Sequence, residues 1–190
     1  MSTAVPTSAT QKIYEIDPVH SHAQFSVRHM MITNVKGEFT KLTGEVILDD
    51  SNPSASRVVA VIDATSINTR EQQRDTHLKS PDFLDVAKFP EIRFESRSVE
   101  RKGPEEYNVT GGLTIHGVTR EVVLSVEGPA PEVKDPWSAV RSGATATTKI
   151  NRKDFGLVWN QALEAGGVLV GEEVKIAIEV ELIRKTAPVA

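Results

Sequence analysis

Apolar and polar residues alternate with a period of two along most of this sequence, and this pattern constrains the fold more than any other feature. The clearest stretch is EVKIAIEVELI, residues 173–183, where every second residue is aliphatic and most of the residues between are charged. Such alternation is typical of a β-strand with one buried face and one solvated face. The same pattern predicts strands over residues 19–30, 38–50, 57–67, 91–100, 107–115, 118–128 and 139–150. We therefore expect eight strands.

Residues 68–90 interrupt this pattern with a polar, helix-prone segment. Thr69 and Gln72 have the spacing of a helix capping box, and Ser80-Pro81 places a proline at the first position of a second helix. Pro90 ends the segment. We predict two short helices that cover one end of a β structure.

Eight antiparallel strands at short spacing predict a sheet that closes on itself, or a sandwich. A closed barrel of eight strands is just wide enough to be filled by side chains or to hold one small ligand. Several residues expected to face inward are small, namely Ala23, Gly111, Ala144 and Ala146. Small side chains leave volume unfilled, which favours a bound ligand. A flattened barrel that collapses on the same residues is the alternative.

Three of the five histidines lie within residues 19–30. His20 and His22 share the polar face of the predicted strand, where two imidazoles could share a metal ion, but a closed metal site needs three or four ligands. We therefore favour histidines that form ordinary hydrogen bonds. His29 lies on the apolar face, either as a buried hydrogen-bonded residue or as a polar contact inside a ligand cavity. A small metal-dependent enzyme or metal-binding protein that uses His20 and His22 remains the alternative function.

Composition and motifs exclude several other classes. The formal net charge of −4 argues against a nucleic-acid-binding surface, which needs a basic face. The chain has no cysteine, and no apolar run approaches the ~20 residues of a membrane span. No nucleophile-elbow, phosphate-loop or zinc-protease motif is present, so we expect no catalytic residue. Residues 1–12 lack the pattern of a secretion signal, which gives the expectation of a disordered leader on a cytoplasmic protein.

Four ordered blocks of the sequence resemble those of the YceI-like family. They are IDPVHSHAQFSVRHMMITNVKGEFTKLTGEV, SINTREQQRDTHLKSPDFLDVAKFPEIRFES, YNVTGGLTIHGVTREVVL and INRKDFGLVWNQALEAGGVLVGEEVKIAIEVEL. The resemblance implies an all-β, lipocalin-like antiparallel barrel over residues 13–184, with a short helical insertion at one end and a flexible tail at 185–190. It also implies a homodimer that holds a polyisoprenoid lipid, such as a quinone or a polyprenyl phosphate, with no other cofactor. Family members are linked to lipid transport, storage and stress responses, and many are periplasmic.

The residues expected to contact the lipid follow from the inward faces of the strands and from the aromatic residues near the insertion. They are Phe25, Val27, His29, Phe83, Phe89, Phe94, Leu113, Ile115, Val122, Leu124, Ala144, Ala146, Ile176 and Ile178. A charged head group cannot stay in an apolar tunnel without a large desolvation cost. We expect it at the helical insertion, against Arg70 and Arg74, because guanidinium groups match phosphate geometry. Glu71 and Asp75 alternate with these arginines, so a salt-bridged surface helix is the alternative.

Overall fold

The structure is a computed structural model that describes residues 11–185 of the 190-residue chain. Eight antiparallel strands form a closed ring, and each strand is hydrogen-bonded to the next in chain order. In that order they are β1 (Gln11–Ile16), β4 (Leu42–Asp49), β5 (Arg57–Asp63), β7 (Glu91–Arg101), β8 (Glu106–Ile115), β9 (Val118–Glu127), β11 (Val140–Asn151) and β12 (Val170–Arg184). Pairing of β12 with β1 closes the ring. The predicted all-β, lipocalin-like barrel is confirmed.

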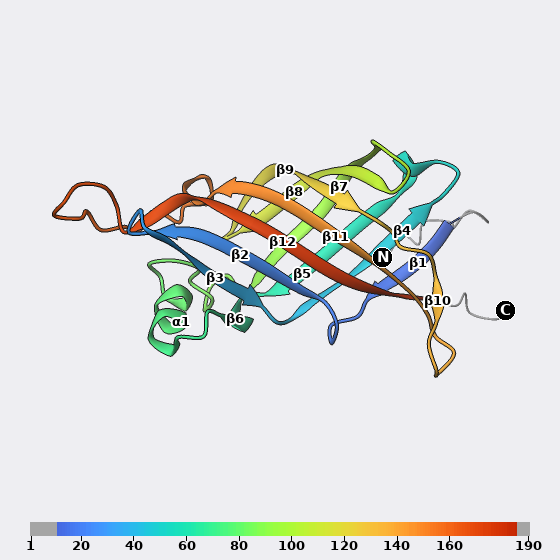
Figure 1. The fold of residues 1–190 in the computed structure, drawn as a ribbon, viewed down its shortest axis with the longest axis horizontal. Helices are drawn as coiled ribbons and strands as arrows, with labels where there is room; N and C mark the ends of the chain where they lie inside the picture. Colours follow the sequence, from blue (N-terminus) through green and yellow to red (C-terminus); the bar gives the residue numbers. More distant parts are fainter. Residues whose placement is uncertain (1–10, 186–190) are drawn as a thin grey trace.

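Four shorter or flanking strands extend this wall. β2 (His22–His29) continues from β1 along β12, and β3 (Thr33–Phe39) and β6 (Ile67–Asn68) follow beside it. β10 (Val133–Lys134) flanks β11. Short 3-10 turns lie at Pro53–Ala55, Ala64–Ser66 and Arg152–Phe155. Figure 1 shows an elongated barrel with the helix α1 near one end and the β4–β5 and β7–β8 connections at the other.

Several predicted strand boundaries are wrong. The strand expected at 19–30 begins only at His22, because residues 17–21 form a corner after β1, and Val19 is 80% exposed. The strand expected at 38–50 is the end of β3 and all of β4, separated at residues 40–41. β1 begins at Gln11, so the predicted leader extends two residues too far; residues 1–10 and 186–190 lie outside the described residues.

The helical insertion is also simpler than predicted. Within the described residues it contains one α-helix, α1 (Gln72–Lys79), and residues 81–87 form turns where a second helix was expected. Glu71 caps α1 by accepting hydrogen bonds from the backbone N–H groups of Gln73 and Arg74. Thr69 donates instead to the carboxylate of Asp75, so the predicted capping box is wrong. No helix in residues 11–185 is long and apolar enough to cross a membrane.

Candidate functional site

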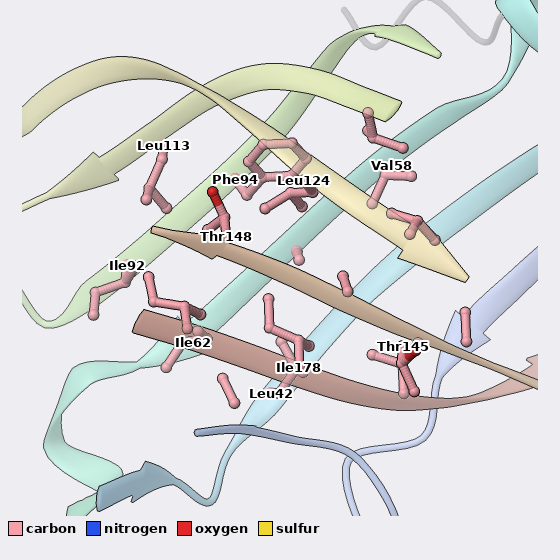
Figure 2. A pocket seen from close by; sticks show the side chains of 18 of the residues that line it. Leu42, Val58, Ile62, Ile92, Phe94, Leu113, Leu124, Thr145, Thr148 and Ile178 are labelled. Carbon is pink, nitrogen blue, oxygen red and sulfur yellow. The ribbon is translucent and has the colours of Figure 1, made fainter. Parts of the chain in front are cut away.

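An apolar cavity of about 490 Å³ runs through the barrel. All eight strands of the ring contribute aliphatic or aromatic side chains to its wall, as Figure 2 shows for Ile62 of β5, Ile92 of β7 and Ile178 of β12. This volume lies within the range of ~300–1,000 Å³ that is typical of sites for small organic ligands. The interior is therefore not completely filled by side chains.

Most of the residues predicted to contact a ligand do line this cavity. They are Phe25, Val27, Phe83, Phe94, Leu113, Ile115, Leu124, Ala144, Ala146, Ile176 and Ile178. The remaining three are placed elsewhere. His29 is half-buried at the end of β2, and Val122 packs against a cluster of buried residues that includes Leu113 and Leu124. The ring of Phe89 makes an edge-on contact with the His116 ring at the β8–β9 turn, with 4.7 Å between centroids.

Residues of β1, β4 and β5 also line the cavity, although none of them was predicted from the sequence. Ile16, Leu42 and Val46 line the cavity, and so do Val58, Ala60 and Ile62. For β5 the alternating pattern did indicate an inward face, because Val58, Ala60 and Ile62 alternate along a segment that was predicted to be a strand. For β4 the inward face was harder to identify, because the apolar–polar pattern does not show the corner at residues 40–41.

Small inward residues differ in whether they leave space. Gly111 leaves none, because a Cβ atom there would lie 2.6 Å from Cζ of Phe94, so the Phe94 ring already fills the position. Ala144 and Ala146 of β11 and Ala23 of β2 do border the cavity. The alanines therefore support the argument from unfilled volume, whereas the glycine does not.

Buried side chains line the helical end of the cavity. Phe83 and Leu84, which follow α1, and Leu157 are each less than 10% exposed and line the cavity there. The Phe83 ring lies 5.2 Å from Trp159 and 5.1 Å from His77, measured between centroids. These contacts join the segment after α1 to the loop that precedes β12.

A buried arginine, Arg152, stabilises the loop at the same end of the barrel. Its side chain is 3% exposed, and its guanidinium donates hydrogen bonds to the backbone carbonyls of Leu157, Trp159, Val170 and Gly171. Burial lowers the pKa of Arg152. The arginine thus ties the loop between β11 and β12 to the start of β12.

The two arginines expected to hold a head group do not line the cavity. The guanidinium of Arg74 donates to Oγ1 and to the backbone carbonyl of Thr69, at 2.8 Å each, and so anchors α1. Arg70 precedes α1 with φ of 63° and is exposed on the outer surface of the barrel. The helical spacing assumed for this pair is therefore absent, and their role in head-group binding stays an untested prediction.

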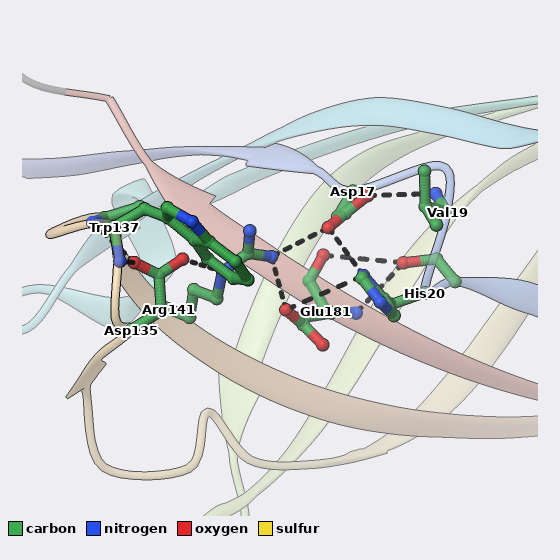
Figure 3. Close-up of polar contacts among 9 residues, drawn as sticks. Asp17, Val19, His20, Asp135, Trp137, Arg141 and Glu181 are labelled. Atoms are coloured by element: carbon green, nitrogen blue, oxygen red, sulfur yellow. Dashed lines mark hydrogen bonds and ion pairs between the residues drawn. The ribbon is translucent and has the colours of Figure 1, made fainter.

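A cluster of charged residues lies outside the cavity, at the corner between β1 and β2 (Figure 3). Asp17, His20 and Glu181 offer ligand atoms within 4.8 Å of one another. The guanidinium of Arg141 contacts the carboxylates of Asp17 and Glu181, and its Nε lies 2.7 Å from Asp135. The positive charge of Arg141 balances these carboxylates. The ion pairs therefore join four segments of the chain.

Protonation equilibria in this cluster follow from the same contacts. Burial alone would raise the pKa of Asp17, but hydrogen bonds from His20 and Arg141 outweigh it and lower the pKa to about 2. The hydrogen bond to Asp17 raises the pKa of His20. His22 lies on β2, 3.8 Å from Glu179, and does not belong to this group. The structure does not unite His20 and His22 in one set of ligands.

Comparison with known proteins places the chain in a family. Residues 14–182 match the YceI-like domain. A UPF0312 protein of Staphylococcus aureus is 38% identical over 169 residues, which are 88% of this chain and 95% of that protein. A UPF0312 protein of Vibrio cholerae is 37% identical over 156 residues, which are 81% of this chain and 82% of that protein.

Solved structures show the same architecture. The Campylobacter jejuni YCEI protein superposes with a TM-score of 0.69 at 30% identity, over 84% of this chain and 90% of that one. Burkholderia cenocepacia BcnA gives 0.74 at 21% identity, over 87% and 98% of the two chains. A polyisoprenoid binding domain from Saccharophagus degradans gives 0.66 at 15% identity, over 90% and 98%. With its closed eight-stranded barrel and a match along almost the whole described chain, this protein belongs to the YceI-like family.

Proposed function

We propose that this protein binds a polyisoprenoid, or a similar long apolar lipid, inside its barrel and acts as a carrier for it. The observation that carries the proposal is the cavity of about 490 Å³ with an apolar wall built from every strand of the ring. Transfer of a lipid chain from water into such a cavity gains about 25 cal/mol for each Å² of apolar surface removed from water. A preformed apolar cavity with few polar groups suits a ligand of this kind.

The family supports the choice of ligand. The Saccharophagus degradans domain that shares the fold is described as polyisoprenoid binding. A quinone and a polyprenyl phosphate are the two ligands we consider first. Roles in lipid transport, storage or stress responses, and a homodimeric state, are part of the same proposal; light scattering on the purified protein would test the dimer.

We propose a binding protein rather than an enzyme, because three of the four charged residues that border the cavity are engaged in structural contacts and the fourth, Glu105, is exposed. Asp49 accepts hydrogen bonds from Ser51 and from the backbone N–H of Asn52, which lower its pKa. Asp50 forms an ion pair with Lys12 at 2.7 Å. Arg152 is surrounded by backbone carbonyls, as described above.

The test is organic extraction and mass spectrometry of protein purified without detergent, followed by uptake of geranylgeraniol by the delipidated protein. We expect a bound isoprenoid lipid and saturable uptake near one chain per barrel. Failure to take up any prenyl chain would refute the proposal. Stoichiometric bound metal, found by elemental analysis in protein that holds no lipid, would favour the metal-binding alternative.

A further inference from the structure

The two ends of the cavity differ in their contact with solvent. At the helical end, the residues that line the cavity are buried or half-buried. At the opposite end, Asp50, Pro104 and Glu105 line the cavity and are exposed. These three residues lie in connections between strands, so their exposure indicates that the cavity reaches the surface there. This end lies at the β4–β5 and β7–β8 connections in Figure 1.

Two other exposed residues border the cavity, and neither marks a second opening. Gln24 and Thr145 alternate with inward-facing alanines on their strands, so their side chains face outward. β2 is paired on both sides at Gln24, with β12 and β3. β11 is likewise paired on both sides at Thr145, with β9 and β12. The wall is therefore closed by backbone hydrogen bonds at these positions.

The connections around the exposed end share a chemical feature. Pro53 of the β4–β5 connection, Pro104 of the β7–β8 turn and Pro129 after β9 all line the cavity. We call these three prolines, together with Asp50 and Glu105, the rim. Proline has no backbone N–H group. An apolar chain that passes a proline therefore desolvates no backbone N–H group at that residue. Removing an unpaired N–H group from water would otherwise cost free energy.

Two arginines hold the rim in place from its outer side. Arg57 donates to the backbone carbonyls of Ser54 and Ser56, and Arg101 donates to those of Gly103 and Pro104, at 2.9–3.3 Å. The exposed residues Asp50 and Glu105 thus lie where the cavity meets water. A polar head group can stay hydrated there, whereas the buried residues at the helical end would desolvate it.

We propose that the lipid enters tail first through the rim and leaves by the same opening. Its head group then remains at the rim while its tail extends toward Phe83, Leu84 and Leu157. This inference rests on the proposed function. It places the head group at the end of the barrel opposite Arg70 and Arg74.

The absence of cysteine from the sequence permits a direct test. Glu105→Cys places one thiol on the rim, and Ala87→Cys places one at an exposed position in the turns after α1. Each variant is capped either with iodoacetamide or with a polyethylene glycol maleimide of about 5 kDa. The rate at which delipidated protein takes up radiolabelled geranylgeraniol from vesicles is then measured. The iodoacetamide-capped protein controls for folding and for loss of the native side chain.

We expect the polymer at residue 105 to slow uptake about tenfold or more, because it obstructs the approach of the ligand, and the polymer at residue 87 to slow it less than about twofold. Slower uptake with the polymer at residue 87, or equal rates at both sites, would overturn the proposed route. Unmodified protein that takes up no lipid at all would instead refute the proposed function, and the route with it.

A second measurement locates the head group. A geranylgeranyl chain with a dansyl head is bound to each variant after the thiol has been labelled with an acceptor dye. Energy transfer should be more efficient to residue 105 than to residue 87. The reverse order would show that the head group lies at the helical end.

Discussion

Substitution of Ala146 by phenylalanine can distinguish a ligand-binding cavity from a packed core, because the two give opposite effects on ligand affinity and on stability. Ala146 faces the interior between Val126 of β9 and Ile178 of β12, and it borders the cavity. A phenyl ring there occupies space that a prenyl chain would otherwise fill. If the ring displaces about one isoprene unit, the lost burial is about 3–4 kcal/mol, at ~0.8 kcal/mol for each CH₂ group. The affinity for geranylgeraniol should then fall by about two to three orders of magnitude.

The stability of the delipidated protein should respond very differently. Because the ring enters unfilled volume, we expect the melting temperature to change by no more than about 2–4 °C, which corresponds to about 1 kcal/mol in a domain of this size. Overpacking of a filled core would instead cost about 1–3 kcal/mol. Ala177→Phe is the matched control, because Ala177 is exposed on the outer face of β12. Displacement titrations give the affinities and calorimetry gives the melting temperatures. Unchanged affinity together with a melting temperature lowered by several degrees would refute the open cavity.

Three further predictions concern the barrel itself. Arg152→Ala removes hydrogen bonds to four backbone carbonyls and should lower the free energy of unfolding by at least about 3 kcal/mol. Proteolysis in residues 156–169 should also become faster. A loss below ~1 kcal/mol in denaturant titrations would contradict this prediction. Gly111→Ala places a methyl group 2.4 Å from a backbone oxygen of β7 and should lower the melting temperature by several degrees, whereas Gly112→Ala, where the nearest atom is a side-chain carbon at 3.3 Å, should change it little. Asp17 has a pKa of about 2 against a usual value of 3.8, so the stability it contributes is present above about pH 4 and is lost as the pH falls toward 2. Asp17→Asn should therefore be less stable than the native protein at pH 6 and approach it near pH 2 in urea titrations; a difference that does not depend on pH would exclude this linkage.

The sequence predicted the barrel because most of its wall follows one simple rule. Burial alternates over residues 91–97 of β7 and over residues 173–180 of β12, and both strands were placed within a few residues of their ends. Corners do not follow that rule. At residues 40–41 the chain turns from β3 into β4 while apolar residues continue on both sides, so the pattern read as one strand. A hydrogen-bonding partner, rather than periodicity, determines where such a strand ends.

The candidate site was predictable only in part, for the same reason. Alternation indicates which side chains face inward, but not how far the opposite wall lies from them. The two arginines predicted to hold the head group do not line the cavity: α1 begins at Gln72, so Arg70 lies outside the helix, and Arg74 donates to Thr69. The rim was not recognised because its prolines lie in three separate connections that only the closure of the barrel brings together.

The cavity stays open because the bulky side chains lie along the wall instead of across the interior. A Cβ atom on Gly37 would lie 2.4 Å from Cζ of Phe25, and one on Gly111 would lie 2.6 Å from Cζ of Phe94, so each ring covers a glycine of a neighbouring strand. The hydrogen-bonded ring of strands sets the diameter of the barrel, and the wall cannot move inward without breaking those bonds. Alanines on β2, β5 and β11 also border this space, where their small side chains fill little of it. Because backbone closure maintains this space, the cavity can be present before a ligand arrives, and binding need not separate packed side chains along its length.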